Sequence, residues 1–386
     1  MAQDPSTRLQ GLVFALVSAV FTTIYIPQPV LPVLGREFGV GVSGASLAVS
    51  GVVLGIALAN LPFGALADRL PIRPILLTGG LVVTACGVGA ALAPTLPLLV
   101  AARFVQGLFV PALTTCLAAY LARTMPAARL NVVMGSYVSA TVVGGLGGRL
   151  LGGFVFPPQH WRWAFLVASA LLLAATLAAH AGLPAEGAPP GAGRAEVRFR
   201  DVLLRHDLFR LYCVSAGAFF VFSSVFNFLP FYLHAAPFGW STRAVTLLYL
   251  SYLVGVVAGP LAGKLSNRVG NGAAMVAGSL VFALGIALTL VPEAWAIALA
   301  LALVCAGFFT IHASATGALN RKLTAGRGRA NAVYVLFYYL GGAAGITSAG
   351  YAYHRSGWQG VAALGGAVLL VPLTTGAVEM RAARAA

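Results

Sequence analysis

The sequence predicts an all-α membrane protein in which twelve transmembrane helices form two pseudo-symmetric bundles of six. Of its 386 residues, 59% are hydrophobic and 9% are charged, whereas soluble domains carry about 25% charged residues. Twelve apolar runs have roughly the 20 residues that are needed to cross a bilayer. Two motifs recur 195 and 197 residues further along the chain. These observations together indicate a duplicated membrane protein.

The repeat consists of two pairs of related segments. Gly64–Arg73 has a copy 195 residues later, at Gly259–Arg268. The glycine cluster Gly144–Gly148 and its downstream Trp161 recur at an offset of 197 residues, with Trp358 as the second tryptophan. Internal duplication of this kind is typical of membrane transporters.

The predicted spans fall into two groups of six on either side of a polar segment. This segment, 184–207, is predicted to be a flexible cytoplasmic linker between an N-terminal bundle, 1–183, and a C-terminal bundle, 208–386. The twelve spans lie near 11–33, 43–66, 74–93, 97–121, 130–156, 162–183, 208–233, 242–265, 273–292, 295–319, 329–353 and 357–379.

The basic residues predict the orientation, because cytoplasmic loops retain Lys and Arg. With the N-terminus inside, 18 of the 24 basic residues are cytoplasmic, 4 are outside and 2 lie within spans. Both termini are therefore predicted to be cytoplasmic, in a bacterial-type inner membrane. The net charge of +15 reflects this topology, and we expect the basic loops to be attracted to anionic lipid headgroups. No nucleic-acid partner is expected.

The loop after the second span resembles the signature loop of the major facilitator superfamily, in the pattern Gly64-(x)3-Asp68-Arg69-(x)3-Arg73. The resemblance covers the whole chain, because the twelve spans, the two halves and the central loop agree with it. It implies a monomeric carrier with a cytoplasmic gate formed by these four residues. Gly263 stands at the Asp68 position of the second copy, which predicts a weaker latch there.

Two further segments resemble motifs of the same family. In the fourth span, Arg103 is followed by a Gln-Gly pair. In the fifth span, Gly144–Arg149 is similar to the glycine-rich motif of exporters, with Gly145 in place of the usual proline and Arg149 in place of a glycine. Together with His160–Phe165, this run resembles a branch of drug- and sugar-efflux permeases and drug/proton antiporters. The resemblance therefore implies export.

Arg103 and Arg149 are the charged residues predicted within spans. Intramembrane charge marks a substrate or ion pathway by default, so both are candidate ligands of an anionic substrate. Two alternatives remain open. Arg103 could extend towards the outer interface, or both arginines could bind carbonyls as structural hydrogen-bond donors.

None of the nine acidic residues is predicted in the middle of a span. His312 is the only histidine predicted well inside the bilayer, and together with Asp68 it is a candidate proton site. A neutral, hydrogen-bonded histidine is the alternative. Coupling through His234 or through the substrate itself also stays open.

Several polar and aromatic residues are candidates for lining a central cavity, although the aromatic ones fit helix packing or an interfacial belt equally well. Pro27, Pro29 and Pro32 are predicted to break the first span and expose backbone groups suited to binding or gating. The cavity candidates are Thr22, Thr23, Tyr25, Gln28, Asn60, Asn227, Tyr232, Tyr249, Tyr252, Tyr334, Tyr338 and Tyr339.

An enzyme is the weaker class, because the sequence has no phosphate-binding loop, metal cluster or nucleophile arrangement. No cofactor or metal is expected. The sequence predicts a secondary transporter of a small molecule that works by alternating access, as a proton-coupled exporter. An organic-anion carrier or exchanger using the two arginines is the alternative, and a non-transporting membrane sensor is the alternative from another class.

Overall fold

The structure of the protein is a computed structural model that describes residues 5–67, 69–125, 127–156, 158–184, 199–323 and 326–385. Every secondary-structure element within these residues is helical, which confirms the predicted all-α fold. The chain divides into two compact units. The first comprises Met1–Gly39 and Leu47–Arg194, and the second comprises Val40–Ser46 and Ala195–Ala386. The bundle limits 1–183 and 208–386 and the linker role of 184–207 stay predictions.

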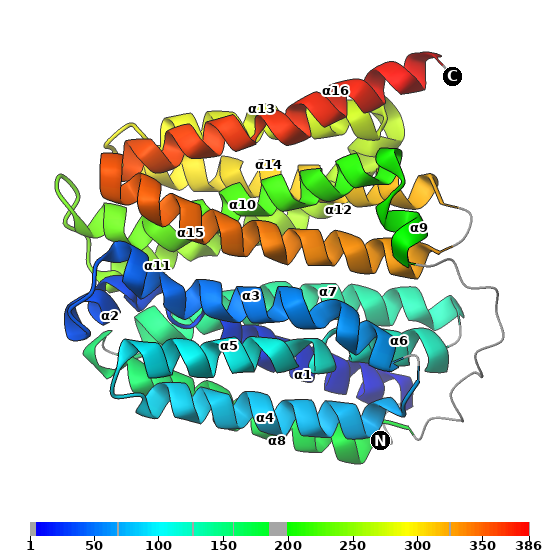
Figure 1. Cartoon of the computed structure of the whole chain (residues 1–386), viewed down its shortest axis with the longest axis horizontal. Helices are drawn as coiled ribbons and strands as arrows, with labels where there is room; N and C mark the ends of the chain where they lie inside the picture. Colours follow the sequence, from blue (N-terminus) through cyan, green and yellow to red (C-terminus); the bar gives the residue numbers. More distant parts are fainter. Residues whose placement is uncertain are drawn as a thin grey trace. The chain divides into compact units, whose positions relative to one another are not determined.

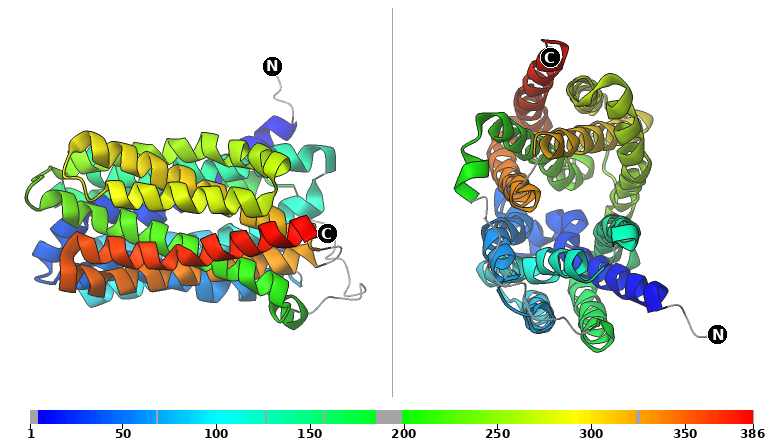
Figure 2. Two further views of the ribbon diagram at one scale, coloured as in Figure 1. Left: turned by 90° about the horizontal axis from the view of Figure 1, so that it is seen from above. Right: turned by 90° about the vertical axis from the view of Figure 1, so that its right-hand side faces the viewer.

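The first unit contains long helices that lie side by side (Figures 1 and 2), together with short helical pieces at the span ends. The start of α3 belongs to the segment that groups with the second unit. The elements are α1 (Pro5–Tyr25), η1 (Gln28–Val30), α2 (Leu31–Glu37), α3 (Val42–Ala67), α4 (Ile72–Leu92), α5 (Leu96–Leu113), α6 (Thr115–Thr124), α7 (Ala127–Leu150), the π-helical turn η2 (Leu151–Val155), η3 (Pro158–His160) and α8 (Trp161–Gly182).

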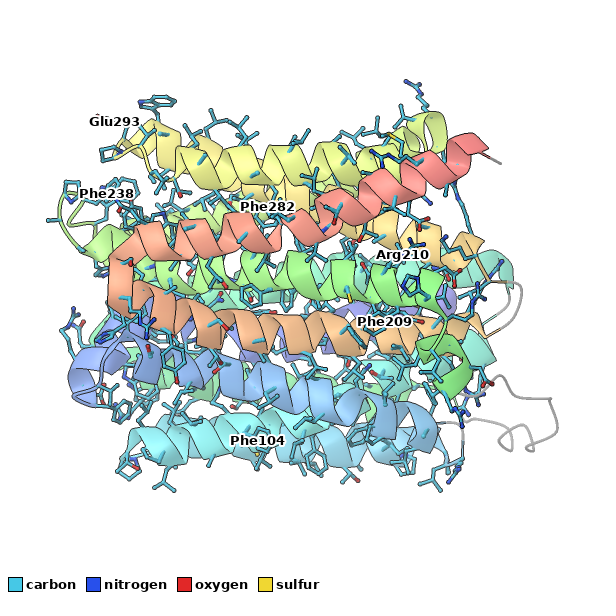
Figure 3. The ribbon with its side chains drawn as sticks, turned by 45° about the horizontal axis from the view of Figure 1, so that its top comes forward. Phe104, Phe209, Arg210, Phe238, Phe282 and Glu293 are labelled. Atoms are coloured by element: carbon cyan, nitrogen blue, oxygen red, sulfur yellow. The ribbon has the colours of Figure 1, made fainter. Side chains whose placement is uncertain are left out.

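The second unit repeats this design after one short helix. Its elements are α9 (Phe199–Leu203), α10 (His206–His234), α11 (Thr242–Leu248), η4 (Tyr249–Ser251), α12 (Tyr252–Val269), α13 (Asn271–Leu288), α14 (Ala294–Arg321), α15 (Arg327–Val368) and α16 (Leu370–Ala385). Figure 3 shows Phe238 and Glu293 at one end of this unit and Arg210 towards the other. The two ends of α10 therefore reach opposite ends of the unit, as expected for a spanning helix.

Corresponding helices pack in the same way in both units. In the first, α1 packs along α7, and α4 packs along α5 and α8; in the second, α10 packs along α15, and α13 packs along α14 and α16. Glycines allow the close approach. A Cβ on Gly148 would strike the backbone of Thr22, and one on Gly345 would strike the backbone of Phe220. The sequence repeat is thus matched by a repeat in packing.

Within the described residues, eleven helical segments are long and apolar enough to cross a membrane, whereas the sequence predicts twelve. The last segment, Arg327–Ala383, has 57 residues and contains both of the final predicted spans. Ser356 and Gly357 have non-helical backbone angles, and the chain reverses direction there (Figure 1). Because the φ of Gly357 is 57°, glycine suits this sharp turn. The structure therefore has eleven continuous segments instead of twelve because the last two predicted spans follow each other without a separating loop.

Candidate functional site

The first candidate region is a break in the first span, between α1 and α2. The helix ends at Tyr25, and Pro27 follows within a turn. A proline has no N–H, so Pro27 cannot donate to the carbonyl of Thr23, four residues earlier. A buried carbonyl without a donor costs free energy, and no water is available in the bilayer core to supply one. The break therefore needs donors from neighbouring helices.

Arg103 of α5 supplies these donors and is fully buried. Its Nη1 atom donates to the Thr23 carbonyl at 2.7 Å, and its Nη2 atom donates to the Ile24 carbonyl. Its Nε atom donates to the carbonyl of Ala48 in α3 at 3.1 Å. A cation at the C-terminal end of α1 also interacts favourably with the helix dipole.

The neighbouring Gln106 completes the network around Arg103. Its side-chain oxygen accepts from Arg103 Nη1, and its Nε2 atom donates to the Val83 carbonyl in α4 at 3.1 Å. Arg103 and Gln106 therefore tie α1, α3, α4 and α5 together. This geometry favours the structural alternative for Arg103 over a role as a ligand of an anionic substrate.

Arg149 contacts the same break, lies near the end of α7 and is buried. Its Nε atom donates to Gln28 Oε1 at 2.7 Å, and its Nη1 atom donates to the Gly145 carbonyl at 2.7 Å. Its guanidinium carbon lies 4.1 Å from the centre of the Tyr25 ring. Arg149 therefore holds two of the predicted cavity residues, Tyr25 and Gln28, against α7.

Gly145 makes room for this arrangement. A Cβ at position 145 would lie 3.3 Å from Arg149 Nη1 and 3.7 Å from the Tyr25 ring. The two departures from the exporter motif, Gly145 and Arg149, are therefore in direct contact. The small residue at one position accommodates the large cation at the other.

The second candidate region is a cluster of aromatic rings in the second unit, contributed by α10, α12, α14 and α15. Phe219 stacks on Tyr338 with ring centres 3.7 Å apart, and Phe222 stacks on Phe308 at 4.0 Å. The ring of Tyr252 lies 4.6 Å from that of Phe226. Because most of these rings are buried, they form a packed, weakly polar cluster.

His312 of α14 lies at one edge of this cluster and is half-buried. Its Nδ1 atom is 3.2 Å from the hydroxyl of Tyr334, and its ring centre is 5.5 Å from that of Tyr338. It also stacks on Phe308 at 6.0 Å. The structure thus places the predicted proton site next to the predicted cavity tyrosines.

Two other predicted cavity residues of the second unit are buried and hydrogen-bonded to neighbouring segments. Tyr249 is buried and donates through its hydroxyl to the Phe226 carbonyl at 3.0 Å. Asn227 is buried, and its Nδ2 atom donates to Ser46 Oγ at 3.0 Å, within the segment that groups with this unit. Its Oδ1 atom has no hydrogen-bond partner among the described residues.

The predicted cytoplasmic gate is described in part. Asp68 lies outside the described residues. Arg69 is exposed and Gly64 is half-buried. Arg73 donates through Nη2 to the carbonyl of His180 near the end of α8, so it ties α4 to α8 within the first unit.

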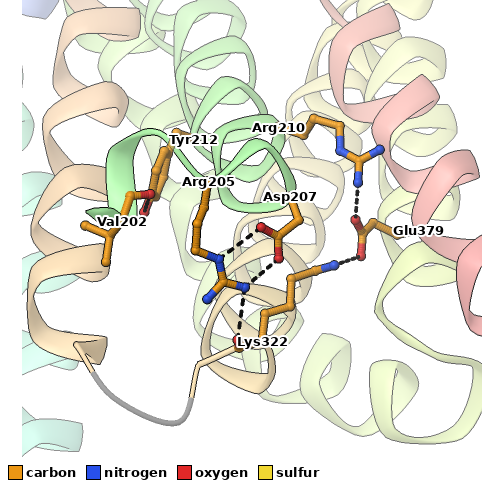
Figure 4. A network of polar contacts seen from close by, with 7 residues as sticks. All are labelled: Val202, Arg205, Asp207, Arg210, Tyr212, Lys322 and Glu379. Atoms are coloured by element: carbon orange, nitrogen blue, oxygen red, sulfur yellow. Dashed lines mark hydrogen bonds and ion pairs between the residues drawn. The ribbon is translucent and has the colours of Figure 1, made fainter. Parts of the chain in front are cut away.

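An ion-pair network that the sequence analysis missed joins three helices of the second unit (Figure 4). Glu379 of α16 lies 3.0 Å from Lys322 Nζ and 3.6 Å from Arg210 Nη2. Arg205 pairs with Asp207 at 2.7 Å and also donates to the Lys322 carbonyl at 3.3 Å. Lys322 and Glu379 are far in the sequence from each other and from the three residues at the start of α10, and only folding brings these parts together.

Comparisons with known proteins agree with this architecture. The family model described as Major Facilitator Superfamily matches residues 13–275 and 235–374. The chain is 28% identical to the inner membrane transport protein YnfM of Escherichia coli, over 96% of this chain and 89% of that protein. It is 32% identical to the probable transporter SCO4007 of Streptomyces coelicolor, over 97% and 88% of the two chains.

A solved structure shows the same fold. The crystal structure of the nucleoside transporter NupG superposes with a TM-score of 0.79 at 13% sequence identity, over 97% of this chain and 100% of that chain. The family match extends over most of the sequence, and the relatives are named as transporters. The chain therefore belongs to the Major Facilitator Superfamily and is a multi-pass membrane transporter of that kind.

Proposed function

We propose that this protein is a secondary active transporter that exports a small aromatic solute across the inner membrane by alternating access, coupled to protons. The observation that carries this proposal is the aromatic cluster around His312. Its rings come from α10, α12, α14 and α15, and its edge holds one imidazole, a side chain that can carry a proton. The resemblance of the Gly144–Arg149 segment to efflux motifs supports export.

The substrate class follows from the chemistry of the cluster. Stacked phenylalanine and tyrosine rings favour a planar solute, and their negative faces attract cations. Arg103 contributes little attraction for an anion, because its donors bind the carbonyls at the break in the first span. We therefore expect a neutral or cationic aromatic solute.

His312 is the proposed proton site. Tyr334, at 3.2 Å from Nδ1, holds one nitrogen of the ring, and the Tyr338 ring lies 5.5 Å away in a T-shaped contact. Uptake of a proton by His312 would place a positive charge against the aromatic cluster, where it would compete with a cationic solute. Such competition is what exchange of a substrate for a proton requires.

The inner gate is proposed to involve Gly64, Asp68, Arg69 and Arg73. The family resemblance suggests that Asp68 latches the loop in the outward-facing state. The contact of Arg73 with the His180 carbonyl gives this loop a fixed base on α8. We expect the transporter to work as a monomer with both termini in the cytoplasm.

A second candidate function is the transport of organic anions through Arg149. The observation that favours it is a buried guanidinium beside Tyr25 and Gln28, at a break in a spanning helix. A non-transporting sensor is a third function, and it would bind a ligand without any flux.

Thermal stabilisation of the purified full-length protein separates the two substrate classes. The probes are ethidium as an aromatic cation, chloramphenicol as a neutral aromatic compound and p-aminohippurate as an aromatic anion. We expect stabilisation by ethidium or chloramphenicol that weakens in His312→Asn and persists in Arg149→Gln. Stabilisation by p-aminohippurate alone, lost in Arg149→Gln, would instead support the anion carrier.

Proteoliposome flux then tests transport itself. Ethidium movement driven by an imposed proton gradient, and reduced in His312→Asn, is the expected result. Ligand binding without flux under any gradient would favour the sensor. An ethidium flux that is the same with and without the proton gradient would refute proton coupling.

A further inference from the structure

The two tryptophans of the sequence repeat occupy equivalent places that the proposed function does not use. Trp161 begins α8, the last long helix of the first unit. Trp358 directly follows the sharp turn that begins the last span of the second unit. Trp161 is fully buried and Trp358 is 5% exposed. Each indole N–H has a hydrogen-bond partner at the end of another helix of its own unit.

In the first unit, the partner of Trp161 is a carboxylate. Trp161 Nε1 donates to Glu37 Oε2 at 2.7 Å, and Arg162 Nη1 donates to Glu37 Oε1 at 2.5 Å. Arg162 also covers the Trp161 ring at 4.4 Å and reaches the Ala93 carbonyl at 3.3 Å. The end of α2, the end of α4 and the start of α8 meet at this point, which we name the first junction.

In the second unit, the corresponding partners are uncharged. Trp358 Nε1 donates to Thr289 Oγ1 at 2.8 Å, and its ring stacks on Tyr232 at 4.6 Å with planes 7° apart. The Tyr232 hydroxyl donates to the Thr289 carbonyl at 2.9 Å. The end of α10, the end of α13 and the start of the last span meet here, which we name the second junction.

The two junctions match position by position but differ in chemistry. Glu37 and Tyr232 both close the first span of their unit, and Ala93 and Thr289 both follow its third span. We propose that Trp161 and Trp358 are equivalent positioning residues, each tying three helix ends of its unit, and that acid opens the first junction only.

The physical reason is that a protonated carboxyl group loses its attraction for a guanidinium. Side chains of Glu37 and Arg162 are 32% and 37% exposed, so water and protons reach the pair. Three charged or titratable side chains lie near Glu37 in the described residues. Arg162 contacts it directly, Arg36 precedes Glu37 on α2, and His160 precedes Trp161. Ala93, directly after α4, contributes a carbonyl that accepts from Arg162. In the second junction, the residues that contact Trp358, namely Thr289 and Tyr232, carry neither a carboxyl group nor an imidazole.

Two reporter variants of the full-length chain test this directly. Each keeps one of the five tryptophans, Trp161 or Trp358, and replaces the other four with phenylalanine. Both carry His160→Gln, so that this neighbouring imidazole cannot quench the indole. Emission and iodide quenching are followed from about pH 8 to about pH 3, across the range in which carboxyl groups take up protons.

We expect a step in acid for the Trp161 reporter, with a red shift and increased iodide quenching, and no step for the Trp358 reporter. Glu37→Gln keeps a hydrogen-bond acceptor without a titrating group, so it should abolish the step. Arg162→Gln should move the step to higher pH, because loss of the cation eases protonation of the carboxylate. Arg162→Lys should keep the step.

Three results would overturn the assignment: no step for Trp161, a step that persists in Glu37→Gln, or an equal step for Trp358. If Glu37→Gln does not fold, the comparison of Arg162→Gln with Arg162→Lys decides. Identical titrations of these two variants would show that the carboxylate does not control the junction.

Discussion

Replacing Arg103 with methionine tests the structural role of this arginine. Methionine keeps a long apolar stem and removes the donors to the carbonyls of Thr23, Ile24 and Ala48. A buried group left without its partner costs about 1–3 kcal/mol. The Ala48 carbonyl lies inside α3 and keeps its intrahelical donor, so two groups, the Thr23 and Ile24 carbonyls, lose their partner. Two such groups would cost about 2–6 kcal/mol before relaxation, and we expect about 2–4 kcal/mol after neighbouring groups adjust.

A double-mutant cycle with Pro27 isolates the cause. Pro27→Ala restores an N–H that can donate to the Thr23 carbonyl, so Arg103→Met should cost about 1 kcal/mol less in that background. Pro29→Ala is the matched control. It restores an N–H that can donate to the Tyr25 carbonyl. Among the described residues, Arg103 donates to other acceptors and not to this carbonyl.

Reversible unfolding in mixed detergent micelles measures the free energy of each variant. Equal costs of Arg103→Met in the wild-type and Pro27→Ala backgrounds would refute the capping of Thr23. Unchanged stability of Arg103→Met, combined with loss of probe binding, would make Arg103 a substrate ligand instead.

Three further predictions concern other parts of the chain. Asp68→Asn should cut transport sharply with expression and probe binding retained, and normal turnover in proteoliposomes would contradict the proposed gate. Gly145→Ala should destabilise the protein by about 1–3 kcal/mol, because its Cβ would press on Arg149 at 3.3 Å. In the control Gly147→Ala, the new Cβ meets one hydroxyl at 3.6 Å, so its free energy of unfolding should stay close to that of the wild type in the same assay. Glu379→Gln should cost about 1–3 kcal/mol at low salt and less at high salt, and a cost independent of salt would argue against an ion-pair role.

Much of the fold could be predicted from the sequence, because each spanning helix satisfies its own backbone and needs a run of apolar residues. The spans, the repeat and the break at Pro27 are local properties of the chain. The turn at Gly357 was harder to assign as a boundary, because two spans follow each other there without a polar loop.

The roles of individual side chains could not be predicted in the same way. The sequence marked Arg103 and Arg149 as unusual, since charge within a span is costly without partners. The partners of Arg103 are carbonyls of other helices, and no sequence pattern indicates which carbonyls will lie near it. The network of Glu379 with Arg210 and Lys322 could not be predicted, because its members lie near the ends of three separate helices.

The sequence by itself determined the number and length of the apolar segments, the duplication and the family, because these depend on composition and on spacing along one chain. Only the tertiary structure decided which charges are satisfied, that Gly145 accommodates Arg149, and that Trp161 binds a carboxylate where Trp358 binds a hydroxyl. Hydrogen bonds and ion pairs act over a few ångströms, and those distances are set by how helices remote in sequence pack together.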